Sequence, residues 1–125
     1  MLRKALITMT ICDIIWLEVI RSSREKSLDF ATKIVSFYKD YSKTKKDTTI
    51  AKQLLHFATS IGGDINEAIY GNSKTDFLST LHISLKETGE SIYWLTLLNK
   101  TKLTDYDFDS LLPLAEEINE CLSPR

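Results

Sequence analysis

The chain has 125 residues, with a hydrophobic fraction of 43%, a charged fraction of 26% and a formal net charge of −1 at neutral pH. This length is enough for one globular domain with a hydrophobic core and too short for two domains. The net charge shows that the protein as a whole is not a polycation. Because the chain holds only four glycines and two prolines, it favours a helical bundle over a sheet.

Residues 1–21 form an N-terminal extension, which we expect to be irregular or partly helical near 14–20. Arg3 and Lys4 precede an apolar run, but Asp13 and Glu18 interrupt it and no small-residue cleavage site follows. The run is too short and too charged to cross a bilayer, so we expect no membrane partner. A start codon placed too far upstream is an alternative origin for this segment.

The first regular helix is expected to begin at Ser22 or Ser23, either of which can cap it, and to end between Asp40 and Thr44. Its apolar face has the spacing of three and four residues that a packed helix shows. This face comprises Phe30, Ala31, Ile34, Phe37, Tyr38 and Tyr41.

The second helix is expected over residues 48–70, and Gly62 and Gly63 lie in its middle. Two interpretations stay open for Gly62: close approach of a neighbouring helix, or a hinge or break in the helix. The apolar period continues through both glycines without a phase shift, which favours close approach. The apolar positions are Ile50, Leu54, Phe57, Ala58, Ile61, Ile65 and Ala68.

The third helix, over residues 73–98, is capped by Ser73 and is apolar on two sides. One side packs on the bundle through Phe77, Leu81, Leu85, Thr88, Ile92, Leu95 and Leu98. The opposite side should be polar, yet it holds large apolar side chains mixed with two glutamates. We interpret it as a contact with another subunit, against the alternative of scattered surface hydrophobes. The expected interface is Ile83, Glu87, Glu90, Tyr93, Trp94 and Leu97.

The last helix is expected to start at Thr104, with Asp107 at the capping distance, and Pro113 should kink it or delay its regular start. Its apolar face is Phe108, Leu111, Leu112, Ala115, Ile118 and Leu122. Together the helices predict an all-α, up-and-down antiparallel four-helix bundle over residues 22–125.

No set of residues in the chain has the pattern of a catalytic device or a metal site. His56 and His82 are isolated on different helices, and no Glu-x-x-His motif accompanies Glu67, Glu87 and Glu90. We therefore expect no enzyme activity, no catalytic residues, no metal and no cofactor. Cys12 and Cys121 form no spaced motif, which indicates a reducing, cytoplasmic setting.

Three ordered blocks of the chain carry a resemblance to a known family. Residues 53–68, QLLHFATSIGGDINEA, are similar to QLLRSGTSIGANIxEA, and residues 73–98 to SKKDFIxKLSIALKEAxExxYWLxLL; REKSLDFA at residues 24–31 fits the opening. These are patterns of the bacterial four helix bundle protein family, whose founding members are encoded in intervening sequences of 23S ribosomal RNA genes. The resemblance covers residues 24–122.

The resemblance implies a non-enzymatic, ring-shaped homo-oligomer, a pentamer, and some relatives bind nucleic acid or partner a reverse transcriptase. This chain departs from the family by having His56 where a basic residue stands, Asp64 in place of an asparagine, and no basic tail. These departures lower the positive charge, so they weaken any transfer of nucleic-acid binding.

Two hypotheses for function stay open. The first is that RNA or DNA binds the basic region around the first connection, where clustered rather than net charge would contact phosphates. The second is a structural or adaptor oligomer that binds another protein, such as a reverse transcriptase, through the acidic last helix. The lysines of the first hypothesis are Lys39, Lys43, Lys45, Lys46 and Lys52.

Overall fold

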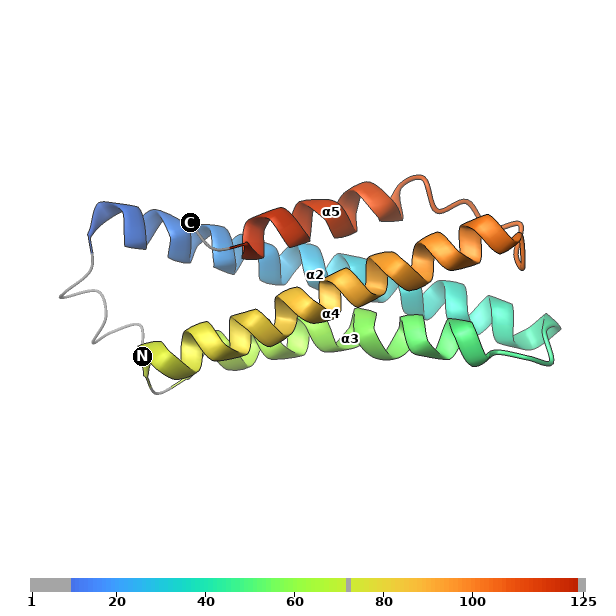
Figure 1. Cartoon of the computed structure of the whole chain (residues 1–125), viewed down its shortest axis with the longest axis horizontal. Coiled ribbons are helices and arrows are strands. Elements are labelled where there is room, and N and C mark those ends of the chain that lie inside the picture. Colours follow the sequence, from blue (N-terminus) through green and yellow to red (C-terminus); the bar gives the residue numbers. More distant parts are fainter. Residues whose placement is uncertain (1–9, 72, 124–125) are drawn as a thin grey trace.

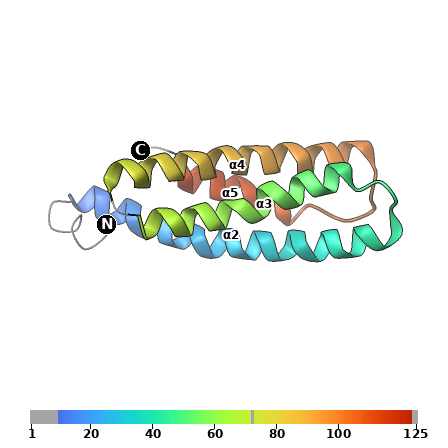
Figure 2. The same ribbon diagram turned by 90° about the horizontal axis from the view of Figure 1, so that it is seen from below.

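The described residues, 10–71 and 73–123 of a computed structural model, form helices and no strand. The helices, labelled as in Figure 1, are α2 (Ile11–Thr44), α3 (Thr49–Ile69), α4 (Lys74–Thr101) and α5 (Leu111–Leu122). Each is antiparallel to the next, and the α2–α3 and α4–α5 connections lie at the same end of the molecule in both views (Figures 1 and 2). Around the bundle, α2 contacts α3 and α5, and α4 contacts the same two helices. The predicted all-α four-helix bundle is confirmed.

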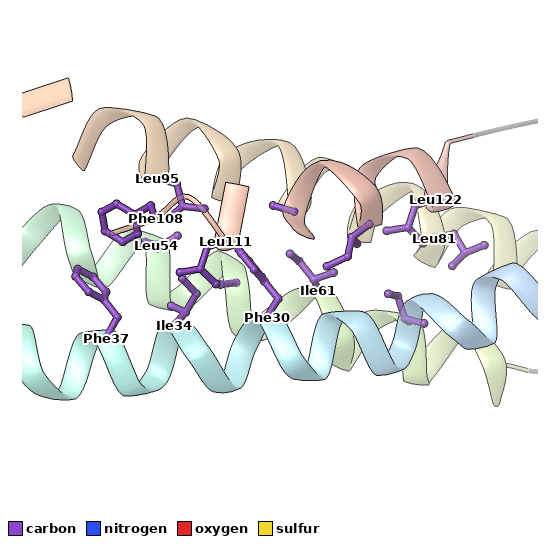
Figure 3. Close-up of a cluster of buried hydrophobic side chains, with 14 of the residues drawn as sticks. Phe30, Ile34, Phe37, Leu54, Ile61, Leu81, Leu95, Phe108, Leu111 and Leu122 are labelled. Carbon is purple, nitrogen blue, oxygen red and sulfur yellow. The ribbon is translucent and has the colours of Figure 1, made fainter. Parts of the chain in front are cut away.

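A single apolar core runs along the axis of the bundle, and Figure 3 shows aliphatic and aromatic side chains from all four helices meeting there. The rings of Phe37 and Phe108 lie 5.1 Å apart in an edge-to-face arrangement, which joins α2 to the segment before α5. On α3 the buried side chains recur at steps of three and four residues, as predicted, but the predicted Ile50 and Phe57 are only half-buried and Ala51 is buried instead. The buried residues are Ala51, Leu54, Ala58, Ile61, Ile65 and Ala68, with Ile69 beside them.

The buried stripe of α4 differs in part from the predicted one. Leu85 and Ile92 are half-buried at its edge, while Ser84 and Ser91 occupy fully buried core positions. The Ser84 hydroxyl donates to the Ile61 carbonyl oxygen at 3.0 Å, so a small polar residue brings α3 and α4 close together. Hydrophobic spacing alone misplaces this stripe because small serines hold core positions here.

The first helix begins much earlier than expected, so the predicted start at Ser22 or Ser23 is wrong. α2 starts at Ile11, and Thr10 and Asp13 cap it by exchanging side-chain to backbone hydrogen bonds. Leu17 and Ile20 are buried in the core, and Ser23 is a core residue rather than a cap. The helical part of the N-terminal extension therefore belongs to the packed bundle.

The glycines of α3 lie within a continuous helix, as the unbroken apolar period predicted. A β-carbon at position 62 would lie 2.9 Å from the Ser27 hydroxyl oxygen of α2, whereas one at position 63 would meet nothing within 4 Å. Gly62 is therefore a site of close helix approach, and the hinge interpretation is wrong.

The last helix begins at Leu111, not at Thr104. Residues 104–110 form turns instead, in which the Thr104 hydroxyl accepts from the Tyr106 amide at 3.1 Å and Asp107 accepts from the Asp109 amide at 2.9 Å. Pro113 lies in the first turn of α5, where a missing N–H leaves no helical hydrogen bond unmade, so the predicted delay is confirmed. With 12 residues, α5 is the shortest helix, and α2 runs past its end (Figure 1).

Along residues 10–71 and 73–123, none of the helices combines the length and the apolar character that crossing a membrane requires.

Candidate nucleic-acid and self-association surfaces

The structure brings the predicted nucleic-acid lysines together at one end of the bundle, where α2 ends and α3 begins (Figure 1). Lys39 and Lys43 lie on the last turns of α2, Lys45 and Lys46 in the connection, and Lys52 on the first turn of α3. All five side chains are exposed. We refer to these five residues as the basic end.

Two further lysines lie at this end of the molecule and were missed from the sequence. Lys100 and Lys102 are exposed at the C-terminus of α4, which lies at the same end as the α2–α3 connection (Figure 1). They are about fifty positions away in the chain, so a search for clustered basic residues in sequence does not find them. The up-and-down topology, however, would have placed them there.

Carboxylates interrupt the basic end. Asp40 and Lys45 share an open pocket with Asp105 and Tyr106 of the α4–α5 connection. Asp47 accepts hydrogen bonds from the hydroxyl and amide of Thr49, at 2.7 and 3.0 Å, which lower the pKa of its carboxyl group. The positive charge is therefore mixed with carboxylates, and the field at this end is weaker than the lysines alone would give.

The outer side of α4 exposes only part of the predicted interface. Ile83 is 49% exposed and Tyr93 is 58% exposed, and Glu90 is also exposed. Trp94 and Leu97 are half-buried, and Trp94 packs against the edge of the core. The ring of Trp94 lies 5.1 Å from that of Tyr93, edge to face, so the two aromatics form one unit.

Glu87 lies among other carboxylates on the side of α4 that faces α3. Burial, and after it the adjacent Asp64 carboxyl, with which a protonated Glu87 can share its proton, raise the pKa of Glu87 to about 8. The charge of Glu67 acts in the same direction, whereas the Ser60 hydroxyl opposes it. Oε1 of Glu87 is buried without a hydrogen-bond partner among the described residues.

The sequence analysis considered Glu67, Glu87 and Glu90 together and found no Glu-x-x-His motif beside them. The structure places Asp64 and Glu67 beside Glu87, and Glu90 is exposed. Neither histidine joins these acids: His56 is exposed beside Phe57, and His82 lines a pocket with Trp16 and Leu122. Among residues 10–71 and 73–123, no three His, Cys, Asp or Glu side chains are arranged to hold a metal ion.

Comparison with known proteins gives a family and a structural neighbour. Residues 22–124 match the family model of the 23S rRNA-intervening sequence protein. The fold is similar to the crystal structure of a protein of unknown function from the S23 ribosomal protein family of Bacteroides thetaiotaomicron. That structure is 39% identical, with a TM-score of 0.77, over 83% of this chain and 94% of the other. No curated protein matches this chain.

The predicted family resemblance is confirmed by both findings, and the match includes α3 and α4, which carry the two longest sequence blocks. The chain belongs to the 23S rRNA-intervening sequence protein family.

Proposed function

We propose that this chain is a non-enzymatic building block that assembles with copies of itself into a symmetric homo-oligomer. One observation carries the proposal: α4 is apolar on its outer side as well as on its core side. Ile83 and Tyr93 are largely exposed, next to the half-buried Trp94 and Leu97. A helix that met only the core of its own bundle would be polar there, so a second layer of protein accounts for these side chains.

The family resemblance supports five copies arranged as a ring. In a cyclic assembly each copy contributes the same surfaces, so one exposed apolar side per chain is covered in every copy. The two cysteines outside any spaced motif support a reducing, cytoplasmic location for such a particle.

Size-exclusion chromatography with light scattering tests the proposal. The expected mass is a fixed multiple of 14.3 kDa that persists on dilution to micromolar concentration. Tyr93→Lys, at an exposed position on the outer side of α4, should lower the mass, while the matched change Leu103→Lys, at another exposed apolar position, should leave it unchanged. A wild-type chain that elutes as a 14.3 kDa monomer would refute the proposal.

A second candidate function is the binding of RNA or DNA at the basic end. The observation that favours it is that Lys100 and Lys102 join the five predicted lysines at this end. In a symmetric particle the lysines would be multiplied, and phosphate contacts depend on local charge. The mixed acids predict weak binding that is lost as salt rises.

Retention of labelled RNA and DNA at about 50 mM and at about 200 mM salt tests this candidate. Replacing Lys43, Lys45 and Lys46 by glutamine should abolish retention at the lower salt. Glutamine at Lys74 and Lys86, which are exposed outside the basic end, serves as the control. An assembled particle that shows no retention at low salt would contradict nucleic-acid binding. It would leave the adaptor hypothesis, for which the exposed Glu116 and Glu120 of α5 are the candidate contacts.

A further inference from the structure

A pocket of about 310 Å³ opens between the last turns of α2 and the α4–α5 connection. Its buried side is aromatic, because Phe37 lines it (Figure 3) and is almost fully buried. The ring of Tyr106 lies 5.0 Å from that of Phe37, edge to face, and 5.2 Å from that of Phe108. These two contacts hold the ring in place, yet Tyr106 is 40% exposed. The pocket therefore presents a fixed aromatic ring on which a flat ligand can stack.

The hydroxyl group of Tyr41 is an unused polar group in the same pocket. Tyr41 lines the pocket and is only 7% exposed. Its backbone carbonyl accepts from the Lys45 amide at 3.1 Å, whereas its hydroxyl makes no hydrogen bond within residues 10–71 and 73–123. A tyrosine buried this deeply ordinarily has a partner for its hydroxyl, so the pocket is one hydrogen bond short in the free protein.

Two carboxylates and one ammonium group complete the lining of the pocket. Asp40 of α2 and Asp105 of the connection are exposed, and neither forms an ion pair within the described part of the chain, with Lys45 or with any other cation. The other lysines of the basic end do not line the pocket. Residues 103–110 add two further aspartates and no basic residue. The charge around the pocket is therefore negative on balance, and its acceptors are free.

A guanidinium group matches this set of side chains in shape and in charge. It is flat and cationic, it stacks on aromatic rings, and its five N–H donors can bind two carboxylates at once. A phosphate would meet Asp40 and Asp105 as like charges, and an ammonium group would not stack on Tyr106 as a flat group does. The long stem of Lys45 lets its own charge turn towards solvent, away from a bound cation.

We propose that this pocket binds the guanidinium group of an arginine that a partner polypeptide carries. The guanidinium would stack on Tyr106 and donate to Asp40 and Asp105, and a remaining N–H would reach the Tyr41 hydroxyl. Because the pocket is open to solvent, the rest of the ligand lies outside it, which suits a side chain that projects from another protein. The pocket is complete within one chain, so this inference goes beyond the proposed self-association and does not depend on it.

Three labelled peptides that differ at one residue test the proposal. Each has a single arginine, citrulline or lysine between glycines and serines; citrulline keeps the shape of arginine and removes its charge. In fluorescence anisotropy at about 50 mM salt, the arginine peptide should bind at least about tenfold more tightly than the citrulline peptide. The lysine peptide should lie between them, since it keeps the charge and loses the flat fork of donors.

Variants of the pocket test where the arginine binds. Asp105→Asn and Tyr106→Leu should each weaken the arginine peptide by at least about threefold, whereas Tyr106→Phe, which keeps the ring, should not. Tyr41→Phe should also weaken it, and since the hydroxyl makes no bond in the free protein, the helical circular dichroism should be unchanged. Asp109→Asn is the matched control, because it removes the same charge from an exposed position of the same connection outside the pocket.

The outcomes separate the pocket from nonspecific attraction and from self-association. Equal affinity for the three peptides, or equal losses with Asp105→Asn and Asp109→Asn, would overturn the proposal. Free L-arginine that competes only weakly supports a polypeptide as the source of the guanidinium, and competition as strong as that of the peptide supports the pocket with a small molecule as its ligand. A monomeric chain that binds the arginine peptide would refute self-association alone, and an oligomer that does not bind it would overturn the pocket alone.

Discussion

The hydroxyl oxygen of Ser27 lies 2.9 Å from the place that a β-carbon would take at Gly62. This hydroxyl also donates to the Arg24 carbonyl oxygen at 2.8 Å, and Ser27 is fully buried, so it cannot move away without losing that bond. The spacing of α2 and α3 is thus set by one serine against one missing side chain. Its neighbour Gly63 has no such constraint.

Gly62→Ala should therefore destabilise the fold by about 1 kcal/mol or more, because overpacking outweighs the better helix propensity of alanine. Gly63→Ala, the matched control, should stabilise by about 0.5–1 kcal/mol, since only propensity changes. In a Ser27→Ala background the cost of Gly62→Ala should largely disappear. Urea denaturation of the four variants measures these differences, and equal effects at the two glycines would contradict the close contact.

The N-terminal turns of α2 should contribute to global stability. Ile20 is fully buried and Ile15 is 58% exposed, although both lie in the same apolar run. We expect Ile20→Ala to cost about 2–5 kcal/mol and Ile15→Ala to cost less than about 0.5 kcal/mol. Thermal unfolding followed by circular dichroism tests this difference. A small effect at Ile20 would mean that the extension is not part of the packed bundle.

The C-terminus of α4 ends on an unfavourable residue. Lys102 has φ of 56°, in the left-handed region, where glycine is the preferred residue after a helix. Lys102→Gly should stabilise the protein by about 0.5–1 kcal/mol. Lys100→Gly, two residues earlier within α4, should destabilise it by about 1 kcal/mol. Opposite signs in chemical denaturation are the expected outcome, and a loss at both positions would contradict the cap geometry.

Stability should fall as pH rises, because of Glu87. Its pKa is raised to about 8 in the folded chain by burial and by Asp64, against an ordinary value of 4.5. Between these two values the folded state binds more protons than the unfolded state, so the free energy of unfolding decreases with rising pH. This contribution is complete below about pH 4.5 and is lost by about pH 8.

Glu87→Gln removes the titrating group while keeping the shape of the side chain. Its melting temperature should fall less than that of the wild type between pH 5.5 and pH 8.5, and it should exceed the wild type at the upper pH. Glu90→Gln, at an exposed position nearby, is the control and should follow the wild type. Parallel pH curves for wild type and Glu87→Gln would show that Glu87 is not perturbed in the folded protein.

The parts of the fold that could be predicted from the sequence are those with a clear capping residue or an unbroken apolar period. Ser73 was predicted to cap α4, and its hydroxyl accepts a hydrogen bond from the Asp76 amide at 3.1 Å. The apolar period of α3 was predicted to continue through both glycines, and the helix does so. The start of α2 was missed because the core positions between Ile20 and Phe30 hold serines, which a search for apolar spacing does not count. At α5 the threonine and aspartate signals were real, but they form turns that precede the helix.

Of the two surface features, one could be predicted from the sequence and the other could not. The grouping of lysines at one end follows from the order of the helices along the chain, so the sequence is enough to deduce it. The pairing of Glu87 with Asp64 cannot be deduced from the order of the helices, because it depends on how α3 and α4 are aligned along their axes. That alignment is set by close contacts such as Ser84 to the Ile61 carbonyl, which leave no periodic trace in the sequence.

The difference in length between α2, with 34 residues, and α5, with 12, makes the molecule unequal along its axis. Where α5 is present, four helices shield one another. Beyond its end, the first turns of α2 have fewer neighbours among residues 10–71 and 73–123. Amide hydrogens in the first two turns of α2 should therefore exchange with deuterium by local fraying, whereas those of α3 around Ile61 should exchange only when the entire domain opens. A molecule built this way loosens from one end first.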